Sequence, residues 1–125
     1  MNTSASQQAY FEQVWNYVRQ VPSGKVVTYG QIGKALPEPQ ELDLNNQVVP
    51  AARLVGSAMA ASPVDVPWHR VINSQGKVSS RADASKQVRL LEAEGLRFVQ
   101  GRIDLNKYQW SGPNEAERPQ QHELF

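Results

Sequence analysis

The chain has 125 residues and a mass of 14.0 kDa, which is the usual length of one domain. It contains no cysteine, and this excludes disulfides, thiolate nucleophiles and sulfur-ligated metal sites. The only two histidines, His69 and His122, lie far apart in the sequence. We therefore expect no metal site.

The formal net charge of +1 conceals an uneven distribution. Residues 50–110 contain nine Lys or Arg against five Asp or Glu, whereas residues 37–49 and 111–125 are net acidic. A basic body is compatible with a polyanionic partner, although a modest positive charge is also common without one. No apolar run reaches the roughly 18 residues of a membrane span, and the N-terminus lacks the pattern of a signal peptide. We expect a cytoplasmic protein without membrane association, nucleoid-associated if the source is prokaryotic.

Hydrophobic spacing and turn residues predict four elements in the first part of the chain. Apolar residues recur every three or four positions up to Val21, and Pro22 follows to end an amphipathic helix. Thr28 precedes Gln31 by three residues, the spacing of a capping box, so a second helix should start at Tyr29. The predicted order is a helix over 10–21, a strand at 26–27, a helix over 29–36 and a loop over 37–50.

The second part of the chain is predicted to alternate helices and short strands. Asp83 has the position of an N-cap, and Gly95 that of the residue closing the same helix. In that helix Val88, Leu90 and Leu91 are expected to be buried. The predicted order is a helix over 51–61, a strand at 70–72, a hairpin turn at 73–76, a return strand at 77–78, a helix over 82–94 and a last strand at 96–99.

Two short helices followed by a hairpin outline a winged helix-turn-helix in a mostly helical α/β domain over residues 1–110. The connection over residues 37–50 has about fourteen residues, whereas the common motif has a turn of three or four. Residues 111–125 are polar and contain two prolines. We expect them to form a flexible tail.

The helix predicted over residues 51–61 consists mostly of Ala, Gly and Ser, and Arg53 is its only charged residue. Small residues suit close packing against a neighbouring helix, and they also suit a shallow insertion into a narrow groove with one arginine as a wedge. A helix that reads the major groove carries several Arg, Asn or Gln, but this one offers Arg53, Ser57 and little else. Tyr29, at the start of the preceding helix, either binds a phosphate together with backbone N–H groups or packs its ring on the core.

Residues 66–71, Val-Pro-Trp-His-Arg-Val, form the most specific segment of the sequence. Glu94 could orient His69 through an imidazole N–H, but a nucleophile–His–Glu relay needs Ser or Cys before the histidine, where Trp68 stands. The alternative is a core tryptophan beside a buried histidine with its hydrogen bonds satisfied. Arg81 lies in a polar loop, where it is either solvated or stacks on an aromatic base if the loop closes over a pocket.

Four pieces of sequence together resemble one known family: GKVVTYGQIGKAL, AARLVGSAMAASP, VPWHRVINSQGKV and LLEAEG. Over residues 8–100 the chain is similar to the alkyltransferase-like proteins, which are relatives of the O6-alkylguanine-DNA alkyltransferases. Transferring enzymes carry Pro-Cys-His-Arg in the third piece, and their cysteine accepts the alkyl group; Trp68 occupies that place here. Ser62 replaces the Asn that usually follows the recognition helix.

The resemblance implies a role for individual residues. Residues 51–61 match the recognition helix that enters the minor groove, and Arg53 matches the arginine that replaces the extruded base. Tyr29 matches the tyrosine that pushes the adjoining phosphate, and His69 and Glu94 match the remainder of a hydrogen-bonded relay. The implied DNA contacts are Tyr29, Ala52, Arg53, Gly56 and Ser57. The implied pocket for the flipped base consists of Met59, Trp68, Val71, Val78, Arg81 and Ala82, with Arg81 in the place of a tyrosine of the transferring enzymes.

The resemblance further implies the fold of the C-terminal domain of these alkyltransferases and a non-enzymatic function. The expected partner is double-stranded DNA containing O6-alkylguanine, bound by base flipping as a monomer, without cofactor, metal or alkyl transfer. The bound lesion would be passed to nucleotide-excision repair proteins. Two alternatives remain open: a sequence-specific winged-helix regulator, and an enzyme with residual alkyltransferase or hydrolase activity that uses His69 and Glu94.

Overall fold

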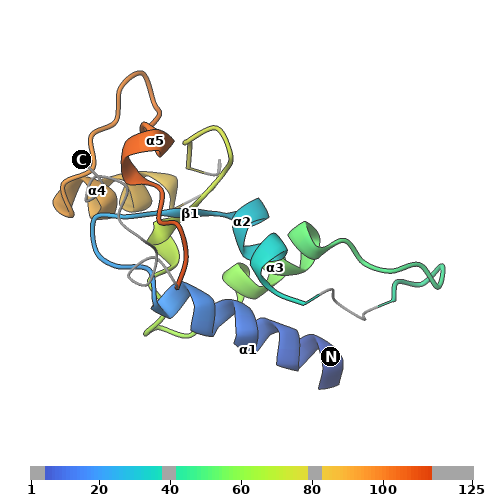
Figure 1. Cartoon of the computed structure of the whole chain (residues 1–125). Helices are drawn as coiled ribbons and strands as arrows, with labels where there is room; N and C mark the ends of the chain where they lie inside the picture. Colours follow the sequence, from blue (N-terminus) through green and yellow to red (C-terminus); the bar gives the residue numbers. More distant parts are fainter. Residues whose placement is uncertain (1–4, 38–41, 79–82, 114–125) are drawn as a thin grey trace, which may run out of the picture.

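The computed structural model describes residues 5–37, 42–78 and 83–113. Helices and short strands alternate along the chain (Figure 1). Within the described residues, no helix is long and apolar enough to cross a membrane. The elements are α1 (Ala5–Arg19), β1 (Val27–Thr28), α2 (Tyr29–Ala35), α3 (Ala51–Ala60), the 3-10 helix η1 (Trp68–Arg70), β2 (Val71–Ile72), α4 (Ala84–Ala93) and α5 (Leu105–Tyr108).

Helix α1 forms one wall of the main core and packs against α3. Its buried face contains Val14 and Val18, which are fully buried. Trp15 of the same helix donates its indole N–H to the backbone carbonyl of Ala58 over 2.8 Å. This bond fixes α3 to α1 by a polar contact in addition to apolar burial. The helix ends at Arg19, two residues before the predicted end.

The capping box predicted before α2 is present. The Thr28 hydroxyl accepts from the backbone N–H of Gln31 over 3.0 Å, and the Gln31 side chain accepts from the N–H of Thr28. Gly33 lies where α2 meets α3, since a Cβ there would be 3.3 Å from that of Ala51. The absent side chain thus allows the two helices to approach closely, which places α3 at the surface beside α2.

The hairpin predicted around residues 70–78 is only half correct. Its turn forms: the Asn73 side chain accepts from two backbone N–H groups, and the Gly76 N–H bonds to the Asn73 carbonyl. However, β2 pairs in parallel with β1, and residues 77–78 form no strand. The physical reason is that Gly76 is held instead by Ile103, whose N–H donates to its carbonyl over 2.9 Å. The predicted wing strand is therefore wrong, and Arg70 belongs to η1 rather than to the strand.

The segment after α4 also differs from the prediction. The strand expected at 96–99 is wrong, because Val99 and Arg102 bridge across a tight turn through Gln100 and Gly101, both with positive φ. Helix α5 follows, which the sequence analysis did not predict. The buried Trp110 then bonds back to Val26 over 2.8 Å. Residues 100–110 therefore complete the core.

Helix α4 begins and ends as predicted, within one or two residues. Asp83 has the N-cap position, yet its side chain accepts no capping hydrogen bond. Gly95 closes the helix with a φ of +99°, which a glycine adopts without strain. Leu91 is fully buried, while Val88 and Leu90 are only half-buried. Of the predicted tail, residues 111–113 are described, with Gly112 buried; the remainder lies outside the described residues.

Candidate nucleic-acid interface

One face of α3 is exposed and carries small side chains around a single arginine. Ala52, Arg53 and Ser57 are exposed and Gly56 is half-buried. The opposite face is buried and packs in the main core through Leu54, Val55, Ala58 and Met59. The two interpretations of this helix are therefore compatible: one face packs against the protein, and the other is free of bulky side chains.

The guanidinium of Arg53 forms no ion pair with any described residue, so its charge is available to an external group. It lines a hollow of about 350 Å³ together with Ser57 and the segment before α3. A cation that is neither paired nor buried is available to an anionic partner.

Tyr29 is the first residue of α2, half-buried, with its ring packed against the main core. It therefore satisfies the structural interpretation. A hollow lies nearby, and Tyr29 is not among the residues that line it. That hollow measures about 470 Å³ and adjoins the start of α2. Its polar lining includes Thr28, Gln31, Lys34 and Ser74.

A cavity of about 180 Å³ lies between the end of α3 and η1. Met59 and Trp68, both predicted pocket residues, line it together with Ala60, Ser62 and Asp83. The last three were not among the predicted pocket residues; their positions at the end of α3, just after it and just before α4 are the signal that could have indicated them.

The other two predicted pocket residues that the structure describes, Val71 and Val78, are not among the residues lining this cavity. Val71 is fully buried in β2, and Val78 packs against a second, smaller core that contains Ile72 and Leu91. Arg81 and Ala82 lie outside the described residues.

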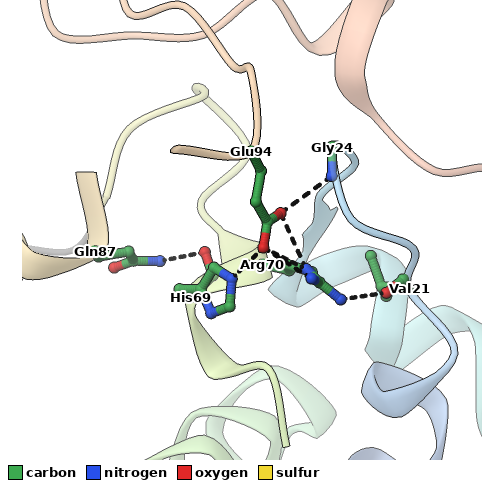
Figure 2. Close-up of polar contacts among 6 residues, drawn as sticks. All are labelled: Val21, Gly24, His69, Arg70, Gln87 and Glu94. Carbon is green, nitrogen blue, oxygen red and sulfur yellow. Dashed lines mark hydrogen bonds and ion pairs between the residues drawn. The ribbon is translucent and has the colours of Figure 1, made fainter. Parts of the chain in front are cut away.

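His69 and Glu94 meet, but Glu94 has more partners than the sequence analysis expected (Figure 2). The His69 Nε2 lies 2.7 Å from Glu94 Oε2. Arg70 donates to the same carboxylate from Nη2 over 2.7 Å and from Nε over 3.1 Å, and also to the Val21 carbonyl. The backbone N–H of Gly24 donates to Glu94 over 3.0 Å. One carboxylate thus connects η1, the end of α4 and the turn after α1.

The pKa of Glu94 follows from these contacts. Burial raises it, but hydrogen bonds from Arg70, His69 and Gly24 outweigh burial and lower the pKa to about 2. At neutral pH the group is a carboxylate and accepts only, so the Nε2 of His69 carries the shared hydrogen. A carboxylate with so low a pKa stays ionised, so within the pair Glu94 orients His69 and does not itself take up a proton.

Two further side chains fix the backbone around the cavity. Gln87 is buried and donates to the carbonyls of His69 and Val71, over 3.0 and 2.9 Å, so that it holds η1 and the start of β2. The Ser62 hydroxyl donates to the Met59 carbonyl over 2.9 Å, which secures the exit of α3. Both contacts satisfy backbone carbonyls beside the cavity.

Most cationic side chains of the described part have no carboxylate partner. Arg19 pairs with Asp65 and Arg70 with Glu94. Among the described residues, no group of three or more His, Asp or Glu could hold a metal ion. The Lys and Arg side chains that form no ion pair within the described ranges are Lys25, Lys34, Arg53, Lys77, Lys86, Arg89, Arg97, Arg102 and Lys107.

Residues 9–96 match the family model of the 6-O-methylguanine DNA methyltransferase DNA-binding domain. The chain is 40% identical to a DNA base-flipping protein of Vibrio parahaemolyticus over 105 residues, covering 81% of this chain and 95% of the relative. It is 35% identical to alkyltransferase-like protein 1 of Schizosaccharomyces pombe over 111 residues, covering 81% and 94% of the two chains.

The structure is similar to that of S. pombe Atl1 in complex with damaged DNA containing O6-carboxymethylguanine. The two superpose with a TM-score of 0.67 at 32% sequence identity, over 89% of this chain and 99% of the other. Fold and sequence therefore agree over most of the described residues.

Proposed function

This chain belongs to the alkyltransferase-like members of the 6-O-methylguanine DNA methyltransferase DNA-binding family, and on that premise we propose that it is a non-enzymatic sensor of O6-alkylguanine in DNA. One observation carries the proposal. The exposed face of α3 combines small side chains with one unpaired arginine, and this helix ends at a cavity lined by Trp68.

In the proposed mechanism α3 enters the minor groove and Arg53 occupies the space of an extruded nucleotide. Ala52, Gly56 and Ser57 have small side chains or none, so the exposed face of α3 can come close to the walls of the groove. Tyr29 at the start of α2 displaces the adjoining phosphate. Extrusion costs a few kcal/mol, and less for a base whose pairing is already impaired. A lesion is thus selected in part by its weak pairing.

The extruded base is received at the cavity beside Met59 and Trp68. An alkyl group on O6 removes the N1 proton of guanine, which changes the hydrogen bonds that the base can make. Arg81, outside the described residues, is proposed to stack on the base. Val71, Val78 and Ala82 are proposed as further pocket residues on the resemblance alone; Val71 and Val78 do not line the cavity, and Ala82 lies outside the described residues.

The proposal includes the absence of alkyl transfer. Position 68 is Trp, and the chain has no cysteine that could accept an alkyl group as a thiolate. The remaining relay of His69 and Glu94 is tied to Arg70, and Trp68 stands where such a relay needs its nucleophile. Incubation with DNA carrying a labelled O6-methyl group tests this point. Label on the protein, or label released with turnover, would show an enzyme instead.

The central experiment measures binding to paired duplexes with and without one O6-methylguanine. We expect tighter binding to the modified duplex. Arg53→Ala should weaken this binding by about 10- to 100-fold, because no side chain then occupies the space that the extruded base leaves in the base stack. Arg97→Ala is the matched control, since Arg97 is equally unpaired but lies just beyond α4. Equal affinity of the parent for both duplexes would favour a sequence-specific regulator, and equal losses in both variants would exclude a special role of Arg53.

We further propose that the complex with damaged DNA is recognised by nucleotide-excision repair proteins in the cytoplasm and that the chain acts as a monomer. A reconstituted incision assay on the modified duplex tests this step. Addition of the parent protein should increase incision, whereas Arg53→Ala should not. Sedimentation at the concentrations of the assay tests the monomeric state.

A further inference from the structure

The connection between α2 and α3 contains a small hairpin with its own hydrogen bonds. Leu42 and Val48 form an antiparallel bridge. The backbone N–H of Asp43 donates to the Gln47 carbonyl over 2.8 Å, and that of Asn46 to the Asp43 carbonyl over 3.0 Å. We refer to residues 42–48 as the hairpin.

The side chain of Asp43 stabilises the same turn. Its Oδ1 accepts from the backbone N–H groups of Asn45 and Gln47, over 2.8 and 3.0 Å. Asn46 has a φ of +63°, which asparagine tolerates better than most residues. The shape of the hairpin is thus determined by local polar contacts rather than by packing on the core.

The hairpin exposes aliphatic side chains. Leu44 is fully exposed, and Leu42 and Val48 are 49% and 59% exposed, whereas the next residue, Val49, is buried in the main core. An ordered turn anchored at one end and carrying exposed leucines is expected to be covered by a partner.

The position of the hairpin indicates which partner. In Figure 1 the segment extends beyond α2 and α3. Leu42, Asp43 and Leu44 line the same hollow of about 350 Å³ as Arg53 and Ser57 of α3. Any duplex that receives the exposed face of α3 therefore lies next to these leucines.

The chemistry of the hairpin suits sugars and base edges rather than phosphates. The described residues 42–48 contain no cation, and the one carboxylate is turned into its own loop. Proteins that bind the minor groove frequently place apolar wedges such as Leu between or against its base steps. The deoxyribose walls of that groove offer the apolar surface that exposed leucines require.

We propose that the hairpin is a second DNA-contacting element, which places Leu44 and Leu42 in the minor groove beside Arg53. The inference rests on the proposed function, because it takes α3 as the element that enters the groove. The hairpin thereby lengthens the contact beyond the recognition helix and supports the opened duplex on the side of Arg53.

The test compares Leu44→Ser with Val64→Ser. Val64 is also a fully exposed aliphatic residue. It lies near the opposite end of α1 from the hairpin, because its neighbour Asp65 pairs with Arg19 at the end of α1, whereas Gln7 at the start of α1 lines the same hollow as the hairpin. We expect Leu44→Ser to weaken binding to the O6-methylguanine duplex by about three- to tenfold. Val64→Ser should bind like the parent.

Two further measurements separate an apolar contact from an electrostatic one. Leu44→Ser should leave the slope of log K against log salt unchanged, because no counterions are released at a sugar contact. Asp43→Ala removes a negative charge near DNA, yet it should weaken binding because the turn loses two hydrogen bonds. Tighter binding of Asp43→Ala would contradict the proposal.

The outcomes distinguish this inference from the proposed function. If the parent prefers the modified duplex but Leu44→Ser and Val64→Ser bind alike, the hairpin proposal is overturned and the sensor remains. If the parent shows no preference, the proposed function fails, and the same two variants on unmodified duplex decide whether the hairpin contacts DNA. A loss caused by Leu44→Ser alone supports the contact.

Discussion

Glu94 shows how one side chain can belong to a site and to the fold at the same time. The sequence analysis assigned it to a relay with His69, and the resemblance gave the same pairing. The structure adds Arg70 and the backbone of Gly24 as donors. A carboxylate that connects three segments of the chain is a structural element even where no reaction needs it.

The first prediction concerns the pH dependence of stability through Glu94. Its pKa of about 2 lies below the unfolded value of about 4.3, so its contribution is present above that value and is lost as pH falls towards 2. We expect Glu94→Gln to lower the free energy of unfolding by about 3 kcal/mol at neutral pH. Urea denaturation of both proteins between pH 6 and the acid limit checks this. A difference that does not shrink below about pH 4 would contradict the explanation.

The second prediction compares two residues in the same N-cap position. Thr28 accepts a capping hydrogen bond at α2, whereas Asp83 makes none at α4. Thr28→Ala should therefore cost about 1 kcal/mol of unfolding free energy. Asp83→Ala should cost less, since only its interaction with the helix dipole is lost. Denaturant midpoints of the two variants decide the order, and the reverse order would refute it.

At the scale of elements, the turn at 73–76 depends on a contact far away in the sequence. Asn73 and Gly76 form the predicted turn, but the element that holds it is the backbone around Ile103. Likewise β2 pairs with β1 rather than with the residues that follow the turn. Local turn chemistry was therefore predictable and the pairing partner was not.

The third prediction isolates this contact with two glycines of nearly equal φ. Gly76 and Gly101 have φ values of +79° and +81°, so alanine suffers a similar strain of about 1 kcal/mol at either position. A Cβ at Gly76 would in addition lie 2.5 Å from the Ile103 carbonyl oxygen, while at Gly101 nothing lies within 4 Å. Gly76→Ala should thus be at least about 1–2 kcal/mol less stable than Gly101→Ala. Similar thermal midpoints would argue against the contact.

For the whole molecule, the distribution of charge matters more than its sum. Lys and Arg without ion-pair partners are spread over the described residues, and they include Lys34 and Arg53 beside the two hollows that adjoin α2 and α3. The acidic residues of 37–49 and 111–125 conceal this excess in the net charge of +1.

The fourth prediction is the salt dependence of DNA binding. Phosphate contacts release counterions, so three or four such contacts should reduce affinity by roughly 40- to 150-fold between about 50 and 200 mM salt. Lys34→Ala should lower the slope by about one contact. Titrations of parent and variant against the same duplex provide the measurement. An affinity independent of salt would be incompatible with groove docking.

The sequence by itself determined the family, the order of helices α1 to α4 and the identity of the chemically unusual residues. Capping boxes, proline and glycine signals and the Val-Pro-Trp-His-Arg-Val segment act locally, so they are readable from neighbours along the chain. The prediction that His69 faces Glu94 came instead from the chemistry of a relay and from the family resemblance, since the two residues lie 25 positions apart.

Only the tertiary structure decided what depends on contacts between distant segments. The pairing of β2 with β1, the cavity between α3 and η1, the burial of Gln87 and the core role of residues 100–110 all belong to this group. The direction in which the hairpin exposes its leucines belongs here too. The physical reason is that burial and long-range hydrogen bonds are properties of the assembled surface, which no local pattern in the chain encodes.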